Sequence, residues 1–470
     1  MNKMEIKQAE HSDDSFKKQK YRYYHKNIEH LIKQAVPEGS RVLDIKCDRG
    51  DLLASLAPSR GVGIDRRPES IEGAKSKYPN SCLEFMCLDI ETEKFLEGRV
   101  FDYIILNDAL GEIADIQLLL RKIHRYCERG TRLIVIQYNP LWERILKMAE
   151  KLNLKMPEKI DNWLSIDDLE NFFTITRFQF IKRDFRLLFP LYFPIFSFLA
   201  NRYLAKLPVV RRLNLIQMIV ARPWVQSDDL TGQSVSVVIT CRDEKENIEP
   251  LVQRIPMLGS HTEIIFVEGH SADATRGEIK RIISKYPEKD IRLLIQDRVG
   301  QKDAIIKGFD LAKGDFIILL EADLTTPPEE ISKLWDAYRI GSGEYINGTR
   351  LVYSMAKGSM PYINLMGNRV FGNIFTGILS QRFTDVLCGL KAVSKKDYLK
   401  IKRSMPLWGD FDPFGDFDII FGAVINNLKV VEVPVKYYPR KYGETKTRPF
   451  KHGWLLFRAC CLGFKKFVLD

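Results

Sequence analysis

Short apolar runs alternate along the chain with stretches of helical periodicity. In the first half the apolar runs cover residues 41–45, 61–65, 83–90, 101–108 and 131–138, with helical patterns between them at 51–57 and 69–78. A second series of apolar runs covers residues 235–240, 263–268, 291–297, 315–323, 344–350 and 430–438. Strands that alternate with helices are typical of a doubly wound sheet. The pattern therefore predicts two α/β domains.

A polar stretch rich in turn-forming residues, 225–234, separates the two series. A chain of 470 residues is too long for one hydrophobic core, so a domain boundary is expected. We place the first domain at 20–224, closed by residues 160–222, and the second at 234–470. The apolar, aromatic run 187–200 is expected to form either a membrane-facing or an inter-domain surface.

Composition restricts which kinds of partner the protein can bind and which cellular compartment it occupies. The net charge of +11 suits an anionic ligand, a membrane surface or nucleic acid, but no five consecutive Lys or Arg occur, which disfavours nucleic acid. Eight cysteines without CxxC pairs indicate reduced thiols rather than disulfides or a zinc cluster. The N-terminus has no apolar leader and no run of about 18 apolar residues occurs. We expect a cytoplasmic protein.

Glu321 and Asp323 follow the apolar run of the fourth strand expected in the second domain. On an extended chain these two residues point to the same side, and α/β sheets bind ligands beyond the carboxyl ends of their strands. Two carboxylates there can hold a hard divalent ion that neutralises a diphosphate. Acidic residues at a polar strand end are also commonplace without any ligand.

Four motifs of the second half occur in order: SVVITCRDEKENI, EIIFVEGHSADAT, GQKDAIIKGFDLAKGDFIILLEADLTTPPEE and RKYGETK. They resemble family 2 glycosyltransferases over about 235–455, in particular the dolichol- or polyprenyl-phosphate sugar transferases. The resemblance implies a GT-A fold, a nucleotide-sugar donor, and Mg²⁺ or Mn²⁺ held by Glu321 and Asp323. It further implies a set of donor-binding residues, namely Cys241, Arg242, Glu244, Glu268, Asp273, Gly300 and Asp303. Lys302 stands where the family has a second glycine.

The same resemblance implies an acceptor-phosphate set and a catalytic set. The acceptor-phosphate set is Arg350, Arg369, Lys391, Arg440 and Lys446. The catalytic set is Asp323, Asp416 and Asp418. Asp416 and Asp418 can alternatively serve as helix N-caps. A hydroxyl acceptor would instead need a carboxylate base, with Asp385, Asp416 and Asp418 as the candidates.

The C-terminal segment is basic and aromatic. Nine Lys and Arg interleave with aromatic residues from 436 to the end, which suits an anionic membrane surface. A helix packed on its own domain is the alternative. The segment 360–379 resembles the interface helix of the family. We therefore expect sugar transfer to a polyprenyl phosphate by a peripheral protein at the inner face of the plasma membrane; transfer to a saccharide hydroxyl is the alternative.

The motifs RVLDIKCDRG, GVGID and CLDIE of the first half resemble class I S-adenosylmethionine-dependent methyltransferases over about 20–222. The resemblance implies a Rossmann-like fold with S-adenosylmethionine as cofactor. It implies cofactor contacts from Asp44 and Gly50 in the first loop, from Asp65 to the ribose hydroxyls and from Asp89 to the adenine amine. Asp65 and Asp89 can each equally be an ordinary residue at a strand end.

The first loop of this half departs from the family. Lys46 and Asp48 replace its first two glycines, and only Gly50 remains. Glycine permits close approach to a cofactor and backbone conformations that side chains disfavour. The chain is therefore either a bifunctional methyltransferase and glycosyltransferase, or a glycosyltransferase whose first domain is a binding or scaffolding module.

Overall fold

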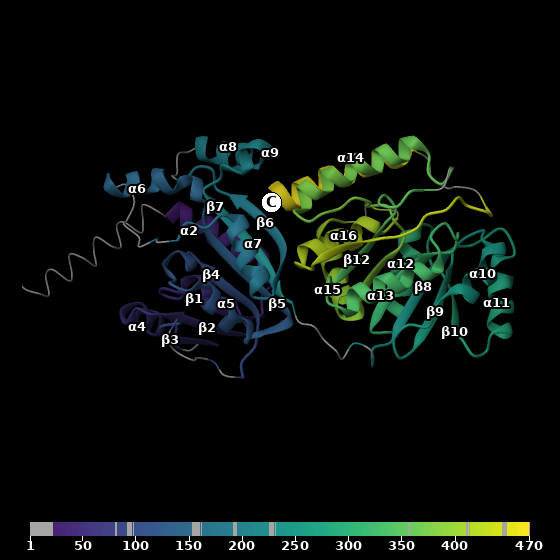
Figure 1. Ribbon diagram of the computed structural model, residues 1–470, viewed down its shortest axis with the longest axis horizontal. Helices are drawn as coiled ribbons and strands as arrows, with labels where there is room; N and C mark the ends of the chain where they lie inside the picture. The colour runs from purple at the N-terminus through teal and green to yellow at the C-terminus, as the bar shows by residue number, and fades with distance from the viewer. Residues whose placement is uncertain are drawn as a thin grey trace, which may run out of the picture. The chain divides into compact units, whose positions relative to one another are not determined.

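The computed structural model describes residues 22–79, 82–91, 96, 98–152, 160, 162–190, 195–224, 230, 232–355, 358–409, 412, 414–443 and 449–469. The chain divides between Val225 and Gln226 into two compact units (Figure 1). This division falls in the stretch expected to be the linker. Each unit is an α/β domain, as the alternating pattern predicts, and each is described by itself below.

Unit 1 contains a seven-stranded sheet in the order β3-β2-β1-β4-β5-β7-β6. Its strands are β1 Arg41–Ile45, β2 Arg60–Asp65, β3 Leu83–Cys87, β4 Phe101–Asn107, β5 Cys127–Tyr138, β6 Phe178–Arg186 and β7 Ile216–Pro223. Strands β1 to β5 pair in parallel, whereas β7 runs antiparallel to both of its neighbours. Consequently β6 points in the same direction as β5, and both end at the edge where β1 and β2 end.

Helices cover both faces of this sheet. They are α2 Arg22–Ala35, α3 Asp51–Ser55, α4 Pro68–Lys77, η1 Leu110–Glu112, α5 Ile116–His124, η2 Pro140–Trp142, α6 Glu143–Lys151, α7 Ile166–Ile175, α8 Phe196–Arg202, η3 Leu204–Lys206 and α9 Pro208–Arg211. Neighbouring strand residues face opposite ways: Leu43 packs in the core with α5 and α7, while Val42 packs in the core with α2. Both faces of the sheet are therefore buried.

Unit 2 contains a second seven-stranded sheet in the order β10-β9-β8-β11-β13-β12-β14. Its strands are β8 Val235–Cys241, β9 Thr262–Glu268, β10 Asp290–Ile295, β11 Phe316–Glu321, β12 Tyr345–Thr349, β13 Lys391–Ser394 and β14 Val430–Pro434. Strand β13 is antiparallel to β11 and β12, and the other pairs are parallel. The helices are α10 Lys245–Arg254, α11 Thr275–Lys285, α12 Gln301–Leu311, η5 Pro328–Glu330, α13 Ile331–Arg339, α14 Tyr362–Leu379, α15 Lys395–Ser404, η6 Met405–Leu407, α16 Asp416–Ile425, α17 Pro449–Gly463 and the π-helical turn η7 Phe464–Leu469.

Three strands were not expected from the pattern. β6 carries the charged residues Lys182, Arg183 and Asp184 in its middle, which hide an apolar run, and β7 was expected only as part of a closing segment. β13 has four residues, too few for a periodic signal. The expected strand 83–90 ends at Cys87, and 430–438 ends at Pro434.

Helices α14 and α17 share one arrangement. Leu456, Ala459 and Cys460 of α17 are buried in the same core as Phe375 of α14. Large apolar side chains remain exposed on the outer side of both helices, at Tyr362, Ile363, Met366, Val370, Trp454 and Phe457. Thus the C-terminal helix does pack on its own unit, and it also presents an apolar surface. Among the described residues, no helix is both long and apolar enough to cross a bilayer.

Candidate functional site

Buried carboxylates and cations gather at the carboxyl end of β11. We call the following set the unit 2 cluster: the acids Glu244, Glu321, Asp323, Asp385, Asp416 and Asp418 with the cations Lys302, Arg350, Lys391 and Arg440. These residues come from β11, β13, α12 and α16 and from the loops that hold Glu244, Asp323, Arg350, Asp385 and Arg440. Most of them were expected as site residues, and the fold brings them into one network.

Glu321 and Asp323 lie close together, although the route differs from the expected one. The strand ends at Glu321 and the chain then turns, with Leu324 in the left-handed region at φ 55°. The Asp323 carboxylate accepts hydrogen bonds from the Thr325 backbone N–H at 3.0 Å and the Thr325 hydroxyl at 2.7 Å. The prediction that Glu321 and Asp323 share one side of an extended strand is therefore wrong. The turn after Glu321 brings Asp323 beside it.

The carboxyl of Glu321 is buried between two constraints. Gln301 donates from Nε2 to Oε1 at 2.9 Å, and a Cβ at Gly389 would stand 2.7 Å from that same oxygen. Burial first, and the charge of Asp323 second, raise the pKa of Glu321 above its ordinary value. Glu321 therefore lies beside a second carboxylate, and a bound cation would favour the charged form of both.

Arg440 bridges two of the acids. Its Nη1 lies 2.5 Å from Glu244 Oε1, and its Nη2 lies 2.6 Å from Asp323 Oδ2. Arg440 comes from the segment after β14, and it was expected to contact the acceptor phosphate. In this structure it neutralises one carboxylate of the donor set and one of the metal pair.

Arg350 is committed to Asp385. Its Nε and Nη2 donate to the two carboxylate oxygens at 2.7 and 2.9 Å, and its backbone N–H donates at 3.1 Å. Burial opposes the charge on Asp385, but Arg350 outweighs it and holds the pKa of Asp385 below its ordinary value. The guanidinium also lies over the Tyr437 ring, 5.0 Å from its centroid.

Asp416 and Asp418 are also paired with lysines. Lys391 Nζ lies 2.9 Å from Asp416 Oδ1, and Lys302 Nζ lies 2.8 Å from Asp418 Oδ2. Both acids belong to the first turn of α16, and not to a segment before it. The capping bonds come instead from Asp412, which accepts from the Phe417 N–H at 2.7 Å. The alternative that Asp416 and Asp418 cap this helix is therefore not what the geometry shows.

The charges of the unit 2 cluster suit a divalent cation. Six carboxylates face four cations. No three His, Cys, Asp or Glu side chains within the described ranges converge as a ready metal site. Mg²⁺ is commonly held by only one or two carboxylates together with substrate phosphates, so Glu321 and Asp323 fit this role with a donor diphosphate completing the ligands.

The other expected donor residues fall into two groups. Cys241, Glu268 and Asp273 lie at or after the ends of β8 and β9; Glu268 Oε1 accepts from the Ser271 N–H at 2.5 Å, and Arg242 is exposed next to Cys241.

Gly300 and Asp303 start α12. Gly300 has φ 119°, which explains the glycine, and Asp303 accepts from the N–H groups of Asp297 and Arg298 at 2.8 and 3.0 Å. Asp303 thus holds its loop in place.

One expected acceptor residue, Arg369, stands apart from the cluster. Arg369 is exposed on α14, and no polar contact links it to the cluster in the ranges that the structure describes. Lys446 lies outside the described residues. Sequence reasoning also missed Gln301 as a partner of Glu321. It interpreted Lys302 only as a lost glycine, whereas the lysine charge could have suggested a buried acid as its partner.

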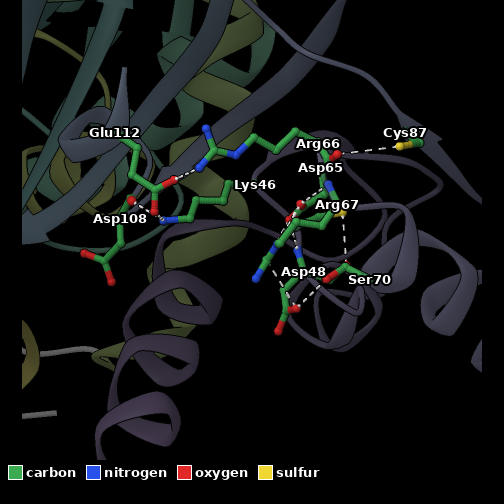
Figure 2. A network of polar contacts seen from close by, with 10 residues as sticks. Lys46, Asp48, Asp65, Arg66, Arg67, Ser70, Cys87, Asp108 and Glu112 are labelled. Atoms are coloured by element: carbon green, nitrogen blue, oxygen red, sulfur yellow. Dashed lines mark hydrogen bonds and ion pairs between the residues drawn. The ribbon is translucent and has the colours of Figure 1, made fainter. Parts of the chain in front are cut away.

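The corresponding edge of unit 1 is filled by its own side chains (Figure 2). Asp65, the expected ribose ligand, receives Arg67 Nε and Nη2, both at 3.0 Å, and the Asp48 backbone N–H at 3.0 Å. Lys46 Nζ donates to Glu112 Oε1 at 2.7 Å and to the Asp108 carbonyl at 2.8 Å. The two carboxylate oxygens of Asp65, which the ribose hydroxyls of a cofactor would need as acceptors, are therefore already hydrogen-bonded within unit 1.

The loop keeps the backbone of the glycine-rich family without the glycines. Lys46 and Asp48 have φ of 68° and 49°, a region that side chains disfavour. Gly50 has φ 76°, and a Cβ there would lie 2.5 Å from the Phe85 ring. The remaining glycine is therefore explained by packing within unit 1.

Two further expected cofactor residues complete the comparison with the family. Asp44 is buried with neither oxygen hydrogen-bonded in the described part of the chain, and burial followed by the charge of Asp65 raises its pKa to about 8. Asp89 is exposed and accepts from the Glu91 N–H at 3.0 Å. With Asp65 held by Arg67, these residues do not fit S-adenosylmethionine.

Comparisons with known proteins divide the chain in the same way. Residues 236–399 match the family described as glycosyl transferase family 2, and residues 16–182 match the family described as methyltransferase domain. The chain is 32% identical to a dolichol-phosphate mannosyltransferase of Pyrococcus furiosus, over 46% of this chain and 59% of the relative. It is 27% identical to an undecaprenyl-phosphate 4-deoxy-4-formamido-L-arabinose transferase of Edwardsiella ictaluri, over 47% of this chain and 65% of the relative.

The matched part of the chain thus spans less than two thirds of either relative. Among solved structures, a putative methyltransferase of Haloferax volcanii in complex with its Trm112 activator is 18% identical, with a TM-score of 0.34 over 45% of this chain and 95% of that chain. The predicted fusion of a methyltransferase-like domain with a family 2 glycosyltransferase domain, and the α/β fold class of both, are confirmed.

Proposed function

Because the chain joins a methyltransferase-type domain to a family 2 glycosyltransferase domain, we propose that unit 2 transfers a sugar from a nucleoside-diphosphate sugar to a polyprenyl phosphate. The two relatives named above act, by their names, on dolichol phosphate and undecaprenyl phosphate. The proposal extends that acceptor class to this chain.

The observation that carries the choice of acceptor is the pairing of every candidate base. Asp385 is bound by Arg350, Asp416 by Lys391 and Asp418 by Lys302. A hydroxyl acceptor needs a carboxylate that can take its proton, and an acid paired with a buried cation is a weak base. A phosphate oxygen is already anionic, so its attack requires positioning and charge balance instead.

The reaction then balances without a proton. An oxygen of the lipid phosphate bonds to C1 of the sugar, the bond from C1 to the donor phosphate breaks, and a nucleoside diphosphate leaves. A divalent ion on Glu321 and Asp323 would neutralise the charge that develops on the leaving diphosphate. The buried cations Arg350 and Lys391 supply positive potential on the acceptor side.

Donor binding must also release Arg440. Its guanidinium occupies Asp323 and Glu244, two groups that the donor and its ion require. Released from them, Arg440 can pair with a phosphate, since guanidinium binds phosphate in a bidentate manner. Arg440 thus exchanges its two carboxylate partners for a phosphate when the donor binds.

The outer faces of α14 and α17 support a peripheral position at the cytoplasmic face of the membrane, where a lipid acceptor is found. Tyr362, Ile363 and Trp454 are among their exposed apolar side chains. No acidic residue occurs in 360–379. An apolar face free of acids suits the interface of an anionic bilayer.

The test is a screen of nucleotide sugars with the full chain and purified polyprenyl phosphate in detergent, following release of nucleoside diphosphate. We expect turnover that depends on both the lipid phosphate and a divalent ion. Turnover with soluble saccharides, no gain from lipid phosphate and loss of activity on removal of one carboxylate among Asp385, Asp416 and Asp418 would contradict the acceptor class.

A further inference from the structure

Strands β6 and β7 of unit 1 are joined by an insertion. The two strands are adjacent and antiparallel, a geometry that a loop of about two to five residues can close. Here β6 ends at Arg186 and β7 starts at Ile216, so residues 187–215 lie between them. A connection of this length needs a reason beyond closing the hairpin.

The insertion is firmly attached on its inner side. Asn214 Nδ2 donates to the Phe185 carbonyl of β6 at 3.0 Å, and the Asn214 carbonyl accepts from Asn139 Nδ2 at 2.9 Å. Asn201 Nδ2 donates to the Tyr23 hydroxyl of α2 at 3.1 Å. Ser197 and Ala200 of α8 are buried. The helices of the insertion therefore have a fixed inner face, and their outer face is equally defined.

That outer face is apolar. The exposed fraction exceeds 45% for each of Phe196, Phe198, Leu199, Tyr203, Leu204 and Leu207. Soluble surfaces rarely gather so many large apolar side chains on one short segment.

Helix α6 extends this surface. Trp142, at its start, donates from Nε1 to the Leu213 carbonyl at 2.7 Å, which places α6 beside the insertion. Leu141, Ile145, Met148 and Leu152 are all exposed, at a spacing that puts them on one side of the helix. We call the outer faces of 195–207 and α6 the apolar edge of unit 1; α6, α8 and α9 lie on the same side of that unit in Figure 1.

The charge of the insertion identifies its partner. Residues 187–215 contain no Asp or Glu and four cations, Arg202, Lys206, Arg211 and Arg212, of which Arg211 pairs with Asp184 of β6. Helix α6 adds the acids Glu143 and Glu150 and the cations Arg144, Lys147 and Lys151. Aromatic and aliphatic side chains flanked by an excess of cations complement anionic lipid headgroups above an acyl layer.

We propose that unit 1 docks on an anionic lipid surface through this apolar edge. The methyltransferase-type domain is then a membrane-docking module whose former cofactor edge, at the ends of β1 and β2, lies at the same end of the sheet as the insertion. This inference goes beyond the glycosyltransferase function and does not depend on it.

The first test is local hydrogen exchange of the full chain with vesicles of phosphatidylglycerol and phosphatidylcholine, and with vesicles of phosphatidylcholine alone. We expect protection of amides in 195–207 with the anionic vesicles, reduced by added salt, and no change in α11 of unit 2. Protection that rises with protein concentration in the absence of vesicles would assign the edge to a second copy of the chain and overturn the proposal. Absence of protection would overturn it as well.

The second test is vesicle co-sedimentation of a triple variant, Phe196→Ser with Phe198→Ser and Leu204→Ser. We expect its partition into anionic vesicles to fall at least about tenfold. The matched control is Leu118→Ser with Ile175→Ser, which removes two side chains of unit 1, each 46% exposed, away from the edge. Equal partition of triple variant, control and wild type, with unchanged melting temperatures, would contradict docking through this edge. Transfer in detergent should be the same for all three proteins, which separates this test from that of the glycosyltransferase function.

Discussion

The two strand-end clusters of this molecule differ in their charge balance. In unit 1 the ion-paired acids Asp48, Asp65 and Glu112 meet an equal number of cations, Lys46, Arg66 and Arg67. Asp44, near Asp65, keeps its proton at neutral pH because burial raises its pKa to about 8. In unit 2 six acids face four cations. Both clusters sit at the carboxyl ends of parallel strands, where α/β sheets bind ligands. The balanced cluster is complete without a ligand, whereas the acidic one is completed by a cation.

The clusters also differ in where their cations come from. Arg67 is two residues from Asp65 in sequence, so the two are always together. Arg440 is 117 residues from Asp323 and reaches it from another segment. A partner supplied by a distant segment can withdraw when that segment moves. The pair of Arg67 with Asp65 therefore blocks ligand binding in unit 1, whereas the pair of Arg440 with Asp323 can open for a ligand in unit 2.

The largest effect should come from removing an acid of the unit 2 cluster. Asp323→Asn should lower sugar transfer by roughly a hundredfold or more, since the leaving diphosphate loses its charge partner. Nucleoside diphosphate release measures this, and chelation by EDTA should have the same effect reversibly. Asp48→Asn makes the matched change in the unit 1 cluster and should leave transfer intact. Full activity of Asp323→Asn without metal would contradict the claim that the unit 2 cluster, unlike the unit 1 cluster, requires a cation.

The next effect concerns stability. Arg350→Ala leaves the buried Asp385 without its partner, which should cost roughly 3–5 kcal/mol of unfolding free energy. Arg67→Ala in unit 1 removes a partner that is 44% exposed from an acid, Asp65, that is also buried. It should cost less, roughly 1–3 kcal/mol, because Asp65 keeps hydrogen bonds from the backbone N–H groups of residues 48 and 67. Urea denaturation compares the two. Arg350→Ala combined with Asp385→Ala should recover much of the loss; failure to recover would mean that Arg350 stabilises through other contacts.

A third effect, smaller over any single pH unit, isolates Asp44. Its folded pKa of about 8 lies above its ordinary 3.8, so between these values the folded chain holds a proton that the unfolded chain releases. Unfolding free energy therefore falls as pH rises from 4 to 8, by at most about 1.4 kcal/mol per pH unit. Asp44→Asn removes this dependence, so its melting temperature should gain on the wild type from pH 5 to pH 8. Asp89→Asn, an exposed acid at the neighbouring strand end, should follow the wild type.

The smallest effect is expected from the cofactor of the methyltransferase family. Sub-millimolar S-adenosylmethionine should neither bind in calorimetry nor raise the melting temperature, because Arg67 and the Asp48 N–H already occupy Asp65. Lys46→Gly with Asp48→Gly reopens part of the loop and tests whether any affinity returns. Micromolar binding to the wild type would show that the balanced cluster opens for a ligand, and would favour a bifunctional enzyme.

The sequence predicted best what depends on neighbouring residues. The continuous apolar runs of β8, β9 and β11 are visible because both faces of these strands are buried. Strand β6 escaped prediction because Lys182, Arg183 and Asp184 interrupt its pattern.

The site was predictable as a set of residues and not as a set of pairs. Asp323, Arg350 and Lys391 were singled out, and so were the residues that pair with them, Arg440, Asp385 and Asp416. The pairs that these residues form were not foreseen. Pairing across tens of residues is decided by the fold. It leaves no mark on local spacing, so the commitment of Arg350 to Asp385 could not be foreseen.

Gly389 has a consequence for how mutations of this protein will be interpreted. A Cβ at this position would collide with the Glu321 carboxyl, 2.7 Å from Oε1. Gly389→Ala therefore displaces a proposed metal ligand while leaving every charge of the cluster in place. In a random mutagenesis screen, position 389 should tolerate substitution as poorly as an acid of the site, although it has no side chain with which to touch the substrate. If position 389 does not tolerate mutation, the reason is that the Glu321 carboxyl fills the space that a side chain there would need.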